Sequence, residues 1–279
     1  MTHTSAQPAS GSVAVASRPS LRAVFAAAVR AEWTKLRSVR STMWALLFTI
    51  VSTVGLGALL TSLEVSRWDN RTVTERTGFD PLLYSFAGLN LAQLSIGVLG
   101  VLVMTSEYAT GGITLTFCAV PQRRLLLLSK VTTFSAVTTV VSLVSCVAAF
   151  FIGQALLVPV QAGVGIGDPG VFRAVLGGAL HLVLIGAIAV ALGAIMRRTA
   201  GAVAVLFGVL LVVPGLVLLL PSPWNDDVTK YLPSSAGVAM SAHVQFPNLL
   251  TPAGGLVVLC AYTAVTLLVA AWTLQRRDA

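Results

Sequence analysis

Residues 174–196 read AVLGGALHLVLIGAIAVALGAIM and carry no formally charged side chain. A helix of this length, with a rise of 1.5 Å per residue, extends about 35 Å and can cross a hydrocarbon core of about 30 Å. A membrane-barrel strand would be about 10 residues long and would alternate in polarity, whereas this run is apolar throughout. The stretch therefore predicts a transmembrane helix, and His181 is its one ionisable side chain.

Five other runs share this character and extend the prediction to the whole chain. The predicted spans cover about residues 41–63, 81–106, 131–158, 174–196, 199–220 and 252–274. Only 10% of the 279 residues are Asp, Glu, Lys or Arg, 56% are hydrophobic, and the mean hydropathy is +0.88. Ordinary soluble domains have about 25% charged residues. The composition argues against a soluble domain and predicts an all-α polytopic membrane protein with six transmembrane helices.

The basic residues predict the orientation of these spans. With a cytoplasmic N-terminus, 13 of the 18 Lys and Arg residues lie inside, and the formal charge is +10 inside and −2 outside. Because Lys and Arg accumulate in cytoplasmic loops, we expect both termini in the cytoplasm. The net charge of +8 is then a topology signal and does not predict nucleic-acid binding. Residues 1–20 are rich in Ala, Ser and Pro, which predicts a disordered cytoplasmic tail.

Residues 21–40 predict an interfacial helix that precedes the first span. Its apolar residues recur at helical spacing and are Leu21, Phe25, Val29, Trp33 and Leu36. Its basic residues away from that face are Arg22, Arg30 and Arg37. Glu32 falls on the apolar side, where Lys35 at i+3 can pair with it. We expect the helix to lie along the inner leaflet with Trp33 at headgroup level. The alternative is a basic flank that only orients the first span.

Residues 107–124, EYATGGITLTFCAVPQRR, connect the second and third spans on the cytoplasmic side. Gly111 and Gly112 permit a sharp chain reversal. The apolar residues that can share one face of a short helix are Ile113, Phe117 and Val120, and Pro121 ends that helix. The basic residues that lead back to the membrane are Arg123, Arg124 and Lys130. Such a helix suits docking into a groove of a soluble partner, and an ordinary loop is the alternative that composition leaves open.

Two outer segments and one proline complete the pattern. Residues 64–80 carry mixed charge and predict a solvated loop, which can include a short helix. Residues 221–251 contain four prolines, yet residues 236–244 lack formal charge apart from a possible one on His243, so this segment can dip back into the bilayer. Pro214-Gly215 predicts a kink in the fifth span.

Four motifs occur in order along the chain: Glu32-Trp33-x-Lys35-Leu36-Arg37-Ser38-x-Arg40-Ser41, Glu107-Tyr108-x-x-Gly111, Pro121-x-Arg123-Arg124 with Lys130, and Tyr231-Leu232-Pro233-Ser234-Ser235-Ala236-Gly237. Together they resemble the membrane subunit of an ABC transporter, of the ABC-2 type-2 permease family and its small bacterial members. The resemblance covers nearly the whole chain beyond residue 20. It departs at Gly112, where family members commonly have Thr.

The resemblance implies a permease subunit of an ATP-driven exporter in the bacterial cytoplasmic membrane. It implies a homo- or heterodimer of permease chains, each of which contacts a separate cytosolic ATPase. The implied coupling residues are Glu107, Tyr108, Gly111, Gly112, Ile113, Phe117, Val120, Pro121, Arg123 and Arg124. The implied elbow-helix residues are Phe25, Val29, Glu32, Trp33, Lys35, Leu36 and Arg37. Residues 221–251 would form the re-entrant outer helices.

The chain itself lacks the motifs of an enzyme or a cofactor protein. It contains no Gly-x-x-x-x-Gly-Lys-Ser/Thr sequence, so we expect ATP and Mg²⁺ to bind the partner ATPase. Its three histidines are widely separated and predict no metal site. The alternative function is a six-helix secondary transporter or a membrane assembly factor that works without an ATPase. The sequence reveals no buried charge pair and no clear inverted repeat, which argues against secondary transport. His181 is a candidate pathway residue, with packing as its alternative role.

Overall fold

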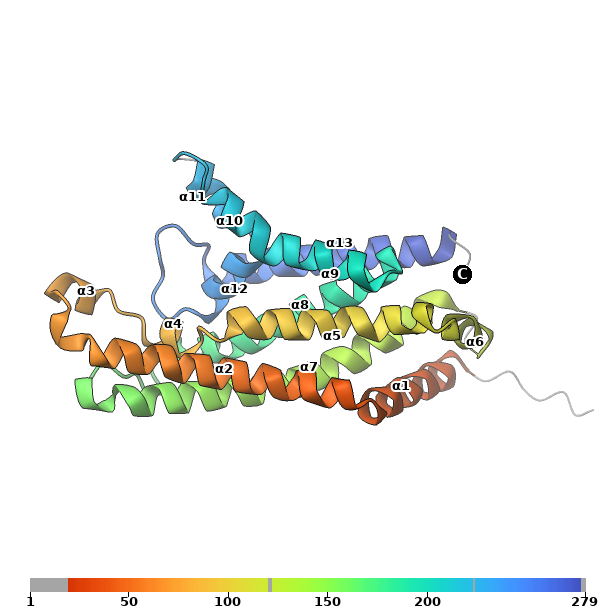
Figure 1. Ribbon diagram of the computed structural model, residues 1–279, viewed down its shortest axis with the longest axis horizontal. Coiled ribbons are helices and arrows are strands. Elements are labelled where there is room, and N and C mark those ends of the chain that lie inside the picture. The colour runs from red at the N-terminus through yellow and green to blue at the C-terminus, as the bar shows by residue number, and fades with distance from the viewer. Residues whose placement is uncertain (1–19, 120–121, 223, 277–279) are drawn as a thin grey trace, which may run out of the picture.

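The computed structural model describes residues 20–119, 122–222 and 224–276, and this part of the chain is all-α. Within it, six helices are long and apolar enough to cross a membrane. They lie side by side along the longest axis of the molecule (Figure 1). The predicted all-α fold with six spans is therefore confirmed, and the membrane spans imply contact with the lipid bilayer.

The helices alternate between long spans and short connecting elements. The spanning helices are α2 (Arg40–Ser66), α5 (Leu89–Ala109), α7 (Arg123–Leu157) with η2 (Val158–Val160), α8 (Val171–Met196), α9 (Thr199–Phe207) with η3 (Gly208–Val212) and α10 (Val213–Val217), and α13 (Pro252–Arg276). The shorter elements are α1 (Leu21–Ser38), η1 (Trp68–Asn70), α3 (Val73–Thr77), α4 (Pro81–Ser85), α6 (Gly112–Ala119), α11 (Trp224–Thr229) and α12 (Pro233–Ser241).

Helix α8, which contains residues 174–196, forms the centre of the bundle. Two thirds of its most apolar segment is buried, compared with 22% for α2 and α13. Its glycines allow neighbouring elements to approach closely. A Cβ atom at Gly186 would lie 2.8 Å from the ring of Phe134 in α7, and one at Gly193 would lie 2.9 Å from the carbonyl oxygen of Val101 in α5. Small residues on α8 therefore set the spacing of the bundle.

Helix α2 turns its polar side toward the protein and its apolar side outward. Its buried residues are Thr42, Thr49, Ser52, Thr53, Gly57 and Thr61. Its exposed residues include Trp44, Phe48, Val51 and Leu59. The hydroxyl of Ser95 in α5 donates to the carbonyl of Ala45 at 2.9 Å, which joins the two helices. This arrangement reverses that of a soluble helix and is expected where lipid surrounds the bundle.

Two helices differ in extent from the predicted spans. The second span does not begin as one helix at Pro81, because α4 ends at Ser85 and α5 begins at Leu89. The third helix begins at Arg123 rather than after Lys130, since no helix breaker separates these two residues. Lys130 consequently lies within α7, and its side chain is buried.

The fifth span is interrupted near the predicted proline kink. A π-helical turn, η3, precedes Pro214, and α10 and α11 lead away from the other helices (Figure 1). Proline has no N–H to donate to the carbonyl of Leu210, four residues earlier. That carbonyl instead accepts a hydrogen bond from the hydroxyl of Ser234 in α12 at 3.2 Å. The distortion predicted at Pro214-Gly215 therefore also links the fifth span to α12.

Candidate functional site at the junction of α1, α5 and α7

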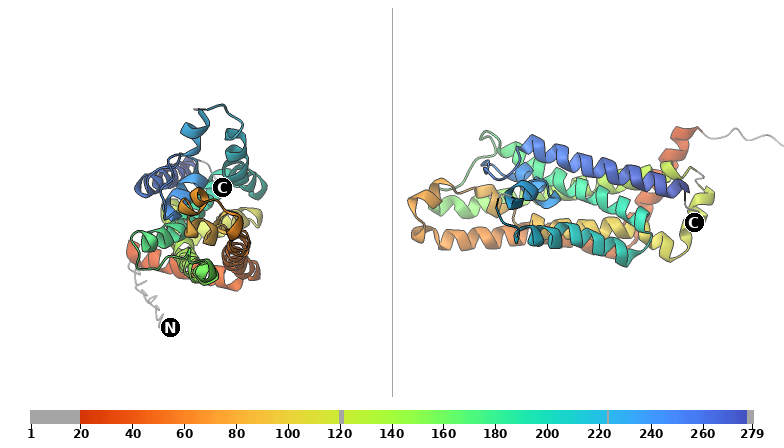
Figure 2. Two further views of the ribbon diagram at one scale, coloured as in Figure 1. Left: turned by 90° about the vertical axis from the view of Figure 1, so that its left-hand side faces the viewer. Right: turned by 90° about the horizontal axis from the view of Figure 1, so that it is seen from above.

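Helix α1 crosses the end of the bundle. Val39 has an extended backbone conformation, which separates α1 from α2, and α1 runs obliquely across the other helices (Figure 2). The residues that α1 buries are Ala28, Glu32 and Leu36. Leu21 and Trp33, which were expected on the same face as Leu36, are more than half exposed. The predicted apolar face is therefore divided, with one side against the bundle and the other directed outward.

Four charged side chains meet where α1 crosses α5 and α7. Lys130 Nζ lies 2.9 Å from Glu32 Oε2 and 2.6 Å from Glu107 Oε1. Lys35 Nζ lies 3.0 Å from Glu32 Oε1 and 2.7 Å from the same Glu107 oxygen. The predicted Glu32–Lys35 pair is present. Two cations and two carboxylates thus form one network, called here the junction network.

Breaking the junction network would leave the buried ammonium group of Lys130 without its two carboxylate partners. The residue is 1% exposed, so its ammonium group depends on the two carboxylates for solvation. The sequence revealed no buried charge pair, but the structure has one here, because the partners of Lys130 lie on two other helices. Lys35 is about half exposed, and burial alone would lower its pKa. Hydrogen bonds to Glu107 and Glu32 outweigh that effect and raise the pKa of Lys35 above its usual value.

The chain reverses directly after Glu107. Gly111 has a φ of +70°, a left-handed conformation that favours glycine, and α6 then begins at Gly112. The predicted reversal is confirmed at Gly111. Glu107 is therefore two residues from the end of α5 and close in sequence to α6, so the junction network directly adjoins this connecting helix.

The face that α6 turns toward the bundle differs from expectation. Ile113 is 4% exposed and belongs to a buried cluster with Met104, Leu127 and Ala194. It is therefore not available as a docking residue in this structure. The side chain of Phe117, and Val120 and Pro121 entirely, lie outside the described residues. Of the predicted apolar face, Ile113 packs into the bundle, while Leu115 of the same helix is 75% exposed and directed outward.

The other described residues of the predicted coupling segment connect the ends of helices. Arg123 Nη1 donates to the carbonyl of Leu274 at 2.8 Å, and Arg124 Nη2 donates to Gln275 Oε1 at 2.8 Å. The guanidinium of Arg197, after α8, lies 5.4 Å from the ring centroid of Tyr108. Sequence reasoning did not predict these contacts, since they join residues that are far apart along the chain.

A cavity of about 520 Å³ adjoins the junction network. Its lining comes from α1, α2, α5 and α6 and includes Glu32, Lys35, Leu36, Glu107, Leu115 and Thr116. The junction network is therefore packed against α7 on one side and faces this cavity on the side toward α6. This asymmetry leaves room for α6 and α1 to move relative to α7.

His181 lies in the packed interior rather than in the junction network. It is 3% exposed, and its Nε2 atom is 3.2 Å from Gln93 Oε1 in α5. Gly237 of α12 packs directly against its ring. Helices α5, α8 and α12 therefore meet at His181, which favours a packing role. Gln93 was missed by sequence reasoning because a lone amide in an apolar run gives no local signal.

No protein-family model matches the chain, and no curated protein matches its sequence. Among the described residues, no group of three His, Cys, Asp or Glu side chains could hold a metal ion. The junction network with the adjoining α6 is therefore the candidate functional site on its geometry alone.

Proposed function

We propose that this chain is the membrane-spanning permease subunit of an ATP-driven ABC exporter, working with a separate ATPase subunit. The observation that supports this proposal most is the position of α6. This short helix connects two spans at the end of the bundle, and the junction network beside it joins those spans to α1. The sequence resemblance of residues 107–124 to a coupling segment supports the same function.

The geometry suggests how motion would pass from α6 to the spans. Ile113 packs against Met104 of α5 and Leu127 of α7, so a force on α6 acts on both helices. Glu107 shares one oxygen between Lys35 and Lys130, so movement of the end of α5 also pulls on α1 and α7. Closure of the ATPase subunits would shift these elements as rigid bodies and change access to a pathway beside a second permease copy.

In this proposal the chain is not an enzyme. ATP and Mg²⁺ bind to the ATPase, and the permease contributes the docking surface and the transport pathway. The proposed location is the bacterial cytoplasmic membrane, with both termini and α6 in the cytoplasm, because the basic residues gather at that end.

Co-purification with a candidate ABC ATPase, co-expressed with this chain, tests the docking surface. Leu115→Asp places a charge on an exposed position of α6, and we expect at least a tenfold loss of retained ATPase. Val73→Asp is the matched control, because Val73 is 79% exposed and lies on α3, at the other end of the bundle. If Leu115→Asp retains the ATPase as well as Val73→Asp does, α6 is not the docking surface.

A transporter that works without an ATPase is the second candidate. The buried ammonium group of Lys130 supports it, whereas the sequence alone revealed no buried charge pair. Buried ionisable residues in membrane proteins often mark ion or proton pathways. Reconstituted liposomes distinguish the two functions. If the chain is an ABC permease, transport is sensitive to vanadate and requires the ATPase. Transport by this chain alone, driven by a proton gradient, would favour the alternative.

A further inference from the structure

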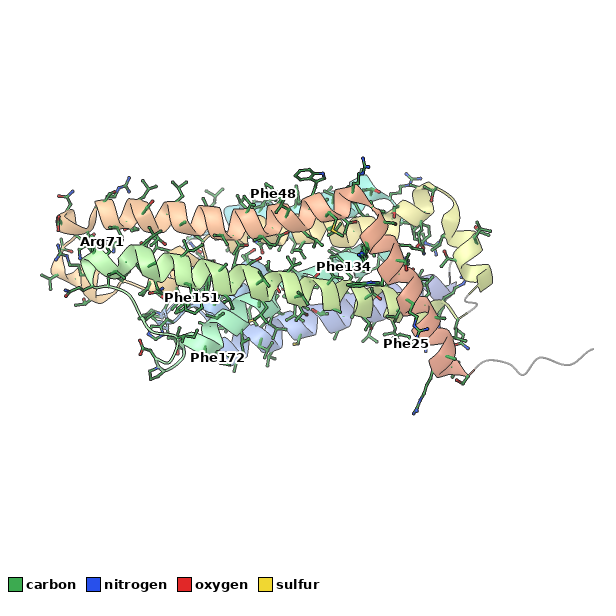
Figure 3. All side chains as sticks on the ribbon, turned by 90° about the horizontal axis from the view of Figure 1, so that it is seen from below. Phe25, Phe48, Arg71, Phe134, Phe151 and Phe172 are labelled. Atoms are coloured by element: carbon green, nitrogen blue, oxygen red, sulfur yellow. The ribbon has the colours of Figure 1, made fainter. Side chains whose placement is uncertain are left out.

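A groove of about 740 Å³ lies at the outer edge of the same end of the bundle. It is formed by the start of α1, the start of α7 and the end of α13. Its lining includes Arg22, Phe25, Arg123, Arg124, Leu128 and Gln275. Figure 3 shows Phe25 on the oblique helix α1, beside the ends of the long helices. The groove is separate from the junction network and shares no lining residue with it.

The polar side of the groove is cationic. Three of its lining residues are arginines, and none of its described lining residues is acidic. Arg124 is held in place by its hydrogen bond to Gln275, at the end of α13. In the described part of the chain, no carboxylate pairs with Arg22 or Arg124. The planar guanidinium group matches the geometry of phosphate oxygens and favours it as a partner.

The other side of the groove is apolar and open. Leu21 and Leu128 are both more than half exposed, and Phe25 and Leu125 extend this surface. The groove lies where the spanning helix α7 begins, the spanning helix α13 ends and α1 begins. The ends of spanning helices are expected near the boundary between headgroups and hydrocarbon. A ligand that fits must carry a phosphate beside a long apolar chain, which is the chemistry of an anionic phospholipid.

We infer that this groove binds an anionic phospholipid of the inner leaflet. Its phosphate contacts Arg22 and Arg124, and an acyl chain lies along Phe25 and Leu128. Basic pockets between helix ends on the cytoplasmic side are suited to anionic headgroups. A soluble anion would gain nothing from the apolar wall, which favours the lipid. The bound lipid adds a contact between α1 and the ends of α7 and α13, which Arg123 and Arg124 already join to each other.

Native mass spectrometry of the full-length protein in detergent tests this site. The probes are phosphatidylglycerol and phosphatidylcholine with identical acyl chains. We expect the wild-type chain to retain phosphatidylglycerol preferentially. The Arg22→Gln/Arg124→Gln variant should lose about tenfold or more of that preference, since each arginine near an anionic lipid contributes about fivefold.

Arg67→Gln/Arg76→Gln is the matched control, because it removes the same charge from exposed residues at the opposite end of the molecule. If the groove is the binding site, this variant keeps the wild-type preference for phosphatidylglycerol. An equal loss in both variants would indicate a general charge effect and overturn the site, as would unchanged preference in Arg22→Gln/Arg124→Gln.

Thermal unfolding gives a second readout that does not depend on transport. Phosphatidylglycerol should raise the Tm of the wild-type chain more than phosphatidylcholine does, because a ligand that binds only the folded state stabilises it. The Arg22→Gln/Arg124→Gln variant should respond equally to the two lipids. Millimolar inorganic phosphate should not reproduce the effect, and if it does, the groove is a simple anion site rather than a lipid site.

Discussion

Lys130 is the residue on which the end of the bundle depends most. Its ammonium group is buried and contacts Glu32 and Glu107, which lie on two other helices. Burying an isolated ammonium group is very unfavourable, and its two carboxylate partners offset that cost. Breaking a buried ion pair by removing one member is strongly destabilising, because the remaining charge is left unpaired.

Lys130→Met should therefore destabilise the protein by about 3–5 kcal/mol. The measurement is thermal unfolding in detergent, followed by tryptophan fluorescence. The triple variant Glu32→Gln/Glu107→Gln/Lys130→Met removes the stranded carboxylates as well and should recover part of the lost Tm. A wild-type Tm for Lys130→Met, or a still lower Tm for the triple variant, would contradict this account of the junction network.

Lys35 gives the junction network a pH dependence at its exposed edge. Its pKa is raised in the folded state by hydrogen bonds to Glu107 and Glu32, which outweigh the effect of burial. A group with a raised pKa binds its proton more tightly in the folded protein, so its contribution is fully present below the unfolded pKa of about 10.4. That contribution is lost as the pH rises through the folded pKa.

We expect Lys35→Met to lower the Tm at pH 7 to 9 and to reduce the fall in Tm above pH 10. A Tm-versus-pH series on the variant and the wild-type chain measures this difference. Arg30→Met is a suitable comparison, because Arg30 is an exposed base on the same helix. Identical alkaline profiles for Lys35→Met and the wild-type chain would show that Lys35 does not contribute in this way.

At the scale of single elements, α6 combines a buried face with an exposed one. Ile113 holds α6 to the bundle through Met104, Leu127 and their neighbours, while Leu115 projects outward. Substitutions at these two positions should therefore have different consequences, although the positions are only two residues apart. A comparison of variants at Ile113 and Leu115 therefore distinguishes the role of α6 in folding from its proposed role in docking a partner.

Ile113→Ala should cost about 2–5 kcal/mol of stability, as expected for truncation of a buried aliphatic side chain. Leu115→Ala should change the Tm little. Thermal unfolding of the two variants in the same detergent makes the comparison. Equal Tm values would mean that α6 does not pack against α5 and α7 as the structure has it.

The π-helical turn at Gly208–Val212 is a second element whose role depends on its neighbours. Pro214 cannot donate to Leu210, and Ser234 supplies a donor from α12. Ser234→Ala should cost about 0.5–1.5 kcal/mol, because it leaves the Leu210 carbonyl without that bond. Ser222→Ala provides a control, since Ser222 is exposed and precedes α11. A matching Tm for the two variants would indicate that the Ser234 bond adds no stability.

At the scale of the whole molecule, the charges divide between the two ends. The end with α1, α6 and the C-terminal part of α13 is rich in Arg and Lys, and the opposite end contains α3 and the α7–α8 connection (Figure 1). This distribution predicts that α6 faces the cytoplasm.

Cysteine labelling of intact cells tests that orientation. In a variant without Cys118, Cys146 and Cys260, Val73→Cys should react with a membrane-impermeant maleimide in intact cells. Leu115→Cys should react only after the membrane is opened. The reverse pattern would place α6 outside and would exclude the proposed contact with a cytosolic ATPase.

Much of this architecture follows from local sequence. Residues 174–196 predicted a transmembrane helix from length and hydropathy, and Gly111 and Gly112 predicted a chain reversal from their conformational freedom. Helix α7 begins at Arg123, before the predicted third span, because charge alone was taken as the limit of that span. A lysine can enter a helix beyond that limit when partners on other helices neutralise it, and these partners are invisible locally.

The sequence by itself determined the six spans, because hydropathy adds up residue by residue along a single helix. It also determined the Glu32–Lys35 pair, whose members are three residues apart on one helix face. Only the tertiary structure decided that Lys130 meets Glu32 across 98 residues, that Ile113 points inward, and that His181 meets Gln93. These contacts depend on how the helices pack against one another. Small residues set the helix spacing, and buried polar groups must find partners wherever the packing provides them.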